Sequence, residues 1–128
     1  MRRTLTQGTG GGELIDRMTR LEIQLEEGLG PAQATQVRQE LERLRVRRSE
    51  ILDGSDDLVL LTAQLKAINR TLCFIEEDMR HQQRHELGQH FVELAHALFI
   101  NTEQRATLIK RINRLRPSRP PWMNPRTS

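Results

Sequence analysis

The fold of this chain is decided by the stretch LVLLTAQLKAINRTLCFIEEDM, residues 58–79. Its apolar side chains recur with alternating spacings of three and four residues, the period of an amphipathic α-helix that packs along a seam. The seam consists of Leu58, Leu61, Leu65, Ile68, Leu72, Ile75 and Met79. Three heptads without a miss predict a helix over 56–84, a rod of roughly 44 Å at about 1.5 Å per residue.

Less regular stripes of the same kind flank this segment. They predict helices over residues 13–27, 31–52 and 89–115. In the second of these helices, Arg48 takes a position where the seam should be apolar. Gly54 is expected to end that helix in a left-handed conformation, and Ser55 to cap the next one. Because the connections are short, consecutive helices are expected to run antiparallel.

The composition agrees with a helical fold. The chain has 128 residues, which suits one domain, and it contains three Phe, one Trp and no Tyr, too few aromatic residues for a typical sandwich or barrel. We therefore predict an all-α fold: an antiparallel helical bundle, or a long helical hairpin with coiled-coil-like heptads and two shorter helices packed on it. The two longest helices would outreach the first, so a second copy of the chain (a homodimer) or a helical protein partner is expected.

Both ends of the chain differ from the helical body, residues 13–115. Residues 1–12 are rich in glycine and are predicted to be a disordered leader. Residues 116–128, RPSRPPWMNPRTS, contain four prolines and are predicted to be a disordered basic tail. The stretch 105–128 carries seven basic residues and no acidic residue. Such an end attracts polyanions, although a solubilising tail is the commoner explanation.

Cys73 is the only cysteine, so the chain cannot form an internal disulfide, which fits a reducing compartment. Cys73 is expected to be a small buried side chain and not a catalytic thiol. The most apolar run, FVELAHALFI at 91–100, contains Glu93 and His96 and is too short to cross a bilayer. The sequence therefore predicts a cytoplasmic protein without a membrane span.

Six short segments carry a resemblance to a known family. They are GELIDRMTRLEI at 12–23, VRQEL at 37–41, LKAIN at 65–69, IEEDMR at 75–80, FVELA at 91–95 and NTEQRA at 101–106. In this order they resemble an uncharacterised bacterial family of small helical proteins, catalogued as a domain of unknown function. Thr102 departs from the family's pattern, which usually has an acidic residue there, and residues 116–128 lie outside it. The resemblance implies a helical fold and no activity.

Polar residues interrupt the seam of the last helix at Asn101 and Arg105. In an antiparallel hairpin Arg105 comes level with Asn69, and the first helix could bring Glu13, Asp16 or Glu22 to the same region. We expect either a buried polar network that fixes the helix register or a pocket for an anionic ligand. The candidate ligand-binding residues are Glu13, Asp16, Arg17, Asn69, Glu76, Arg80, Asn101, Arg105, Lys110 and Asn113.

The sequence gives weaker support for catalysis, for a metal site and for binding through the tail. Helical chorismate mutases work with Arg, Lys and Glu from several helices and without a cofactor, but their motif order is not found in this chain. His81 and His85 have a helical spacing that suits zinc, yet no third ligand follows, so neither a metal nor a cofactor is expected. The tail residues that could contact nucleic acid or a partner protein are Arg116, Arg119, Trp122 and Arg126.

The sequence thus favours a non-enzymatic helical module for protein–protein association or self-association. One alternative is a binding protein for a small phosphate or carboxylate ligand, or an enzyme, with a polar pocket between the first, third and fourth helices. The other alternative is a nucleic-acid- or envelope-associated accessory protein that acts through the basic tail.

Overall fold

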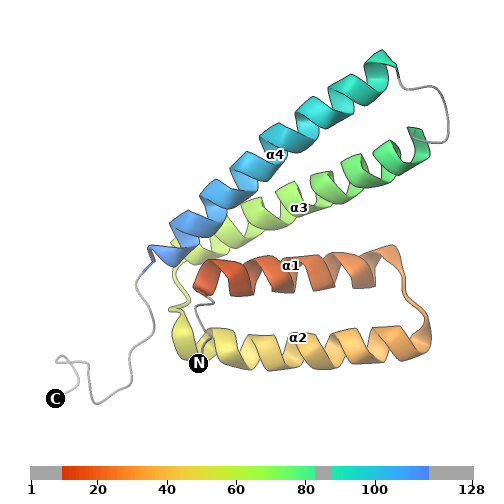
Figure 1. The fold of residues 1–128 in the computed structure, drawn as a ribbon. Coiled ribbons are helices and arrows are strands. Elements are labelled where there is room, and N and C mark those ends of the chain that lie inside the picture. Colours follow the sequence, from red (N-terminus) through yellow and green to blue (C-terminus); the bar gives the residue numbers. More distant parts are fainter. Residues whose placement is uncertain (1–9, 83–87, 116–128) are drawn as a thin grey trace, which may run out of the picture.

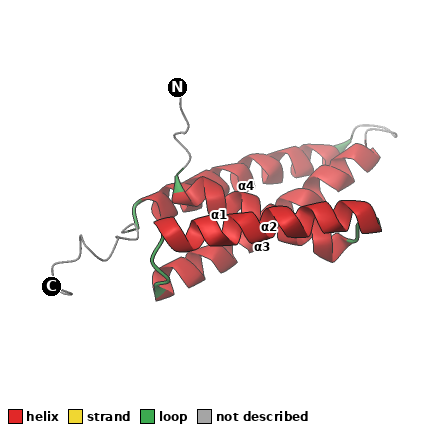
Figure 2. Cartoon of the chain, turned by 90° about the horizontal axis from the view of Figure 1, so that it is seen from below, coloured by secondary structure: helices red, strands yellow, loops and turns green. Residues whose placement is uncertain are grey.

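The chain folds into four α-helices, which confirms the predicted all-α class. The structure is a computed structural model that describes residues 10–82 and 88–115. Within these ranges every regular element is a helix (Figures 1 and 2). The helices are α1 (Gly11–Glu27), α2 (Pro31–Ile51), α3 (Asp56–Gln82) and α4 (Gln89–Asn113).

The helices form two antiparallel hairpins that meet at one end and diverge toward the other (Figure 1). The longer hairpin is α3–α4, and the shorter is α1–α2. Helix α1 packs against all three other helices, whereas α2 packs against α1 alone among the described helices. The predicted long hairpin with two shorter helices is therefore present, but α2 joins it only through α1.

The helix ends follow local rules in most places. The hydroxyl of Ser55 accepts a hydrogen bond from the backbone N–H of Leu58 at 3.1 Å, so the predicted cap of α3 is confirmed. The left-handed glycine was placed wrongly: among the described glycines only Gly28, after α1, has a positive φ, at 104°. Gly54 needs no such conformation, because α2 already ends at Ile51 and the chain continues through Leu52 as an extended C-cap.

Two predicted boundaries need correction. Helix α1 begins at Gly11, so the last residues of the predicted disordered leader 1–12 are helical. Helix α4 ends at Asn113, two residues before the predicted end. The predicted residues 83–84 of α3, the rest of the leader and the tail 116–128 lie outside the described residues.

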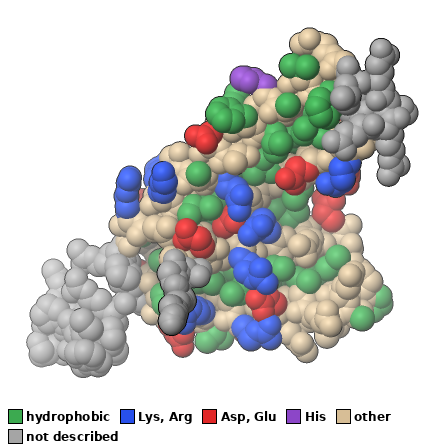
Figure 3. Space-filling view, viewed as in Figure 1, with side chains coloured by type: hydrophobic (Ala, Val, Ile, Leu, Met, Phe, Trp, Pro, Cys, Tyr) green, Lys and Arg blue, Asp and Glu red, His purple; other side chains and the backbone are tan. Residues whose placement is uncertain are grey.

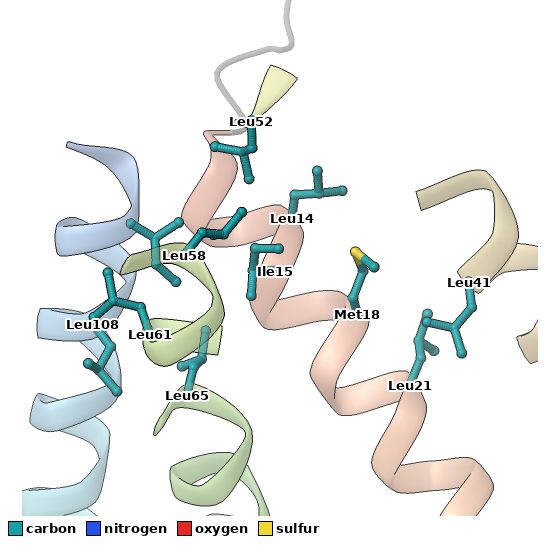
Figure 4. Close-up of a cluster of buried hydrophobic side chains, with 11 residues drawn as sticks. Leu14, Ile15, Met18, Leu21, Leu41, Leu52, Leu58, Leu61, Leu65 and Leu108 are labelled. Atoms are coloured by element: carbon teal, nitrogen blue, oxygen red, sulfur yellow. The ribbon is translucent and has the colours of Figure 1, made fainter. Parts of the chain in front are cut away.

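The apolar core lies where the two hairpins meet (Figure 4). All seven predicted seam residues of α3 are buried or partly buried. Helix α1 is buried beyond its predicted stripe of Leu14, Met18, Leu21 and Leu25, because Ile15 and Ile23 are only 1% and 2% exposed. A helix that contacts three neighbours must bury most of its circumference, and a single apolar stripe could not reveal that. The core cluster comprises Leu14, Ile15, Met18, Leu21, Leu41, Leu52, Leu58, Leu61, Leu65, Leu108 and Ile112.

One described helix is long and apolar enough to cross a membrane. It is the segment Asp56–His81 of α3, not the run at 91–100. A third of its apolar window is buried against the other helices. Because the core helix of a water-soluble protein meets the same criterion, this helix is weak evidence for a membrane span, and the expected absence of a span stays a prediction.

Candidate functional site

Polar side chains from three helices converge on Asp16, in the middle of α1. Arg105 of α4 donates hydrogen bonds to both carboxylate oxygens, from Nε to Oδ1 at 2.9 Å and from Nη2 to Oδ2 at 2.5 Å. Asn69 of α3 donates from Nδ2 to Asp16 Oδ1 at 2.8 Å and to Thr19 Oγ1 at 3.0 Å. The Thr19 hydroxyl in turn donates to the backbone oxygen of Asp16. The cluster therefore joins α1, α3 and α4 at one level.

Burial and charge hold this cluster in one ionisation state. Asp16, Thr19 and Asn69 are 3%, 1% and 2% exposed. Burial by itself raises the pKa of Asp16, but the hydrogen bonds from Arg105 and Asn69 and the nearby positive charges outweigh it and lower that pKa below the ordinary value. Arg20 adds a further ion pair at 3.1 Å. Asp16 is thus a carboxylate that neutralises Arg105, as expected of a packed polar network.

A second polar contact ties α4 to the start of α1. Helix α1 has Gly10 at its N-cap, which offers no side chain for its free N–H groups. Asn113, the last residue of α4, supplies the acceptor: its Oδ1 accepts a hydrogen bond from the backbone N–H of Gly12 at 2.6 Å. Its Nδ2 donates to Glu13 Oε1 at 3.1 Å. Glu13 and Asn113 therefore act as a cap and not as part of the Asp16 cluster.

Three more of the predicted site residues lie elsewhere. Arg17 pairs with Glu40 of α2 at 3.1 Å and so joins the short hairpin. Asn101 donates to the backbone oxygen of Ala97 in its own helix at 2.9 Å, so its polar group is satisfied within α4. Lys110 is exposed on the surface of α4. These three residues therefore lie outside the Asp16 cluster.

Glu76 and Arg80 line an open groove of about 560 Å³ between the end of α1 and the second half of α3. The groove lies in the notch between the diverging hairpins (Figure 3). Phe74 and Cys73 also line it, and Phe74 is 64% exposed. Cys73 is exposed, which corrects the expectation of a buried side chain. Desolvation and the charges of nearby glutamates raise the pKa of its thiol, which disfavours the reactive thiolate.

The metal and tail predictions find no additional support. The described residues contain no group of three or more His, Cys, Asp or Glu side chains that could hold a metal ion. His85, the second histidine of the considered zinc pair, lies outside the described residues. The tail residues Arg116, Arg119, Trp122 and Arg126 also lie outside them.

Helix α4 carries a second stripe that the sequence analysis missed. Its members are Val92, Ala95, Phe99, Thr102 and Ala106, spaced by three, four, three and four residues. All five are exposed, and Val92 and Phe99 are 60% and 65% exposed. Figure 3 shows apolar side chains exposed over this diverging part of the long hairpin. We call these five residues the α4 outer stripe. The signal was present in the sequence but was hidden by the stronger seam beside it.

Comparisons with known proteins assign no family to this arrangement. No family model matches the chain, and neither a curated protein nor a solved structure matches it. The resemblance to an uncharacterised bacterial family therefore stays a prediction.

Proposed function

We propose that this protein is a non-enzymatic self-association module in which two copies pair through the α4 outer stripe. The observation that carries the proposal is the exposure of Phe99 and Val92 on a face with heptad spacing. Exposed apolar residues at heptad spacing are typical of a helix that packs against another helix. The described chain offers no such helix to this face, so the partner must come from outside it.

The stripe is suited to a second copy of itself. Phe99 lies midway between Val92 and Ala106, seven residues from each. In an antiparallel pair of α4 helices related by a twofold axis, Phe99 packs beside Phe99 of the partner subunit, and the larger Val92 faces the smaller Ala106. Large side chains opposite small ones let two helices approach closely and pack densely.

The Asp16 cluster supports the same choice over a ligand pocket. A pocket for a phosphate or carboxylate needs a guanidinium that is free to bind it. The Arg105 guanidinium is already paired with both oxygens of Asp16. A ligand at this place would have to displace a buried carboxylate, which makes the cluster a better structural support than a binding site.

Native mass spectrometry of the full chain, compared with two phenylalanine variants, tests the proposal. Burying one Phe side chain stabilises by about 1.5–3 kcal/mol, and the dimer buries two. Phe99→Glu is therefore expected to raise the dimer dissociation constant at least about a hundredfold. Phe74→Glu is the matched control, because Phe74 is equally exposed on α3. A monomeric wild-type chain, or a dimer that survives Phe99→Glu, contradicts the proposal.

Disulfide mapping tests the antiparallel arrangement. In a Cys73→Ser background, Phe99→Cys is expected to cross-link with itself, because the twofold axis brings its two copies together. Val92→Cys should cross-link only when mixed with Ala106→Cys. A parallel pair would instead cross-link each of these variants with itself.

A further inference from the structure

Arg48 is the unusual residue of α2. It occupies the seam of that helix and is partly buried. Its Nε atom is buried without a hydrogen-bond partner. Within residues 10–82 and 88–115 its guanidinium also forms no ion pair. A buried unpaired donor on a charged group is costly, and such a group calls for a bound water or ion as its explanation.

Arg48 lines an open groove of about 360 Å³ at the end of α2. Arg45 and Ser49, which are three residues before and one residue after Arg48, line the same groove. Arg45 has only a long contact to an exposed carboxylate, at 3.7 Å from Glu42, and such surface pairs contribute little. Two arginines therefore line the same space, whereas the Ser49 hydroxyl donates to the backbone oxygen of Val46 at 2.6 Å. The apolar floor is made by Leu52 and Leu58.

The charge of the groove suits an anion. Its lining contains two arginines and one carboxylate, that of Asp53. Asp53 is exposed and makes no ion pair with either arginine in the described part of the chain. Arginine forks match the geometry of phosphate oxygens with two parallel hydrogen bonds. The volume lies near the lower limit of small-ligand sites, which suits a phosphate group and little more.

We propose that this groove binds a phosphate group, with Arg48 and Arg45 as the charged donors. The phosphate is that of a small soluble molecule or of a lipid headgroup at a membrane surface. The site lies on α2 and the α2–α3 connection, away from the α4 outer stripe, so it does not depend on self-association.

Two binding measurements on the full chain test the site and identify the source of the phosphate. One is calorimetric titration with inorganic phosphate at fixed ionic strength. The other is co-sedimentation with phosphatidylcholine vesicles with and without phosphatidate. Loss of one charge-assisted hydrogen bond is expected to weaken binding about tenfold or more, so Arg48→Gln and Arg45→Gln should each do so. Arg47→Gln makes the same charge change on an exposed side of α2 and should weaken binding less than about twofold.

The two arms give a clear decision. The site is supported if Arg48→Gln and Arg45→Gln weaken phosphate or vesicle binding and Arg47→Gln does not. The measurement that detects binding identifies the source of the phosphate. Equal loss with Arg47→Gln means non-specific attraction and overturns the proposal, as does the absence of binding in both arms. Because Arg45 is half exposed, Arg45→Gln keeps the test valid even if Arg48→Gln lowers stability.

Discussion

The two ends of the long hairpin differ although the same two helices form both. We call the end where the two hairpins meet the closed end. There α1 covers the long hairpin, and Leu58 and Ile112 are 1% and 0% exposed. Toward the diverging end, Phe74 and Phe99 are 64% and 65% exposed. The seam of α3 stays covered toward the diverging end, where Leu72 and Ile75 are 8% and 7% exposed, so the two phenylalanines lie on a further face of each helix that no described helix covers. Periodicity in a sequence reveals a helix face, and only the fold reveals whether that face has a partner.

The largest predicted effect is at the closed end, where Asp16→Ala removes the centre of the polar cluster. Arg105 then loses its acceptor and Asn69 keeps only the Thr19 hydroxyl, and breaking a buried ion pair in this way costs about 3–5 kcal/mol. Urea unfolding at one fixed protein concentration measures the loss. Glu77→Ala, on the exposed side of the groove at the diverging end, is the control and should stay within about 0.5 kcal/mol of wild type.

A smaller loss is expected from Gly12→Ala, which tests how closely α1 approaches α4. A Cβ atom at Gly12 would collide with the backbone carbonyl oxygen of Ile109. The two helices must then separate, and such overpacking costs about 1–3 kcal/mol. Gly54→Ala is the matched control, since nothing lies within 4 Å of its added Cβ. That variant should be neutral or gain up to about 1 kcal/mol through the unfolded chain.

Acid weakens the same end of the molecule. The fold lowers the pKa of Asp16, so its stabilising contribution is complete above the ordinary aspartate value of about 3.9 and is lost as pH falls through the lower folded value. The unfolding free energy of wild type should therefore fall below about pH 4. Asp16→Asn should fall less steeply in the same urea series from pH 7 to pH 3. Some slope remains, because Glu40, whose pKa is also lowered, still titrates. Equal slopes in both proteins would show that Asp16 is not the responsible group.

The smallest effect is predicted at the diverging end, for Phe74→Ser. Its ring is mostly exposed, so its loss should change the unfolding free energy of the monomer by no more than about 0.5 kcal/mol. Chemical denaturation below the dimer dissociation constant measures this. A loss above about 2 kcal/mol would mean that the ring packs into the groove and that the two ends are alike.

Much of the fold could be predicted from local pattern. The seam of α3 was sufficient to place that helix, because its seven apolar residues share one face and Ser55 marks its start. The position of Arg105 opposite Asn69 was also predicted, because an antiparallel hairpin determines which residues of its two helices lie opposite one another. Gly11 and Gly12 were misassigned, because the acceptor for the N–H of Gly12 comes from Asn113, about a hundred residues away.

The candidate site was harder to predict. Asp16 was one of ten polar candidates, and nothing in its neighbourhood marks it as the centre of the cluster. Its role depends on how α1 is rotated between α3 and α4, which is set by packing on three sides. Asn101 was expected to face a neighbouring helix but satisfies its donor within α4. The outer stripe and the groove at Arg48 depend on which surfaces stay uncovered, and this too is a property of the whole fold.

The position of α1 in the middle of the molecule also dictates when the domain can be completed during synthesis. Asp16 and Arg105 are separated by 89 positions, and Gly12 and Asn113 by 101. At about 5–20 residues per second, α1 leaves the ribosome roughly 5–20 s before the helix that supplies its cation and its cap. Until then the side of α1 that packs against α4 is open to chaperones and proteases. A nascent chain that stops before α4 should therefore be digested by protease throughout, whereas the complete chain should be protected, so the last helix to be made decides whether the first one survives.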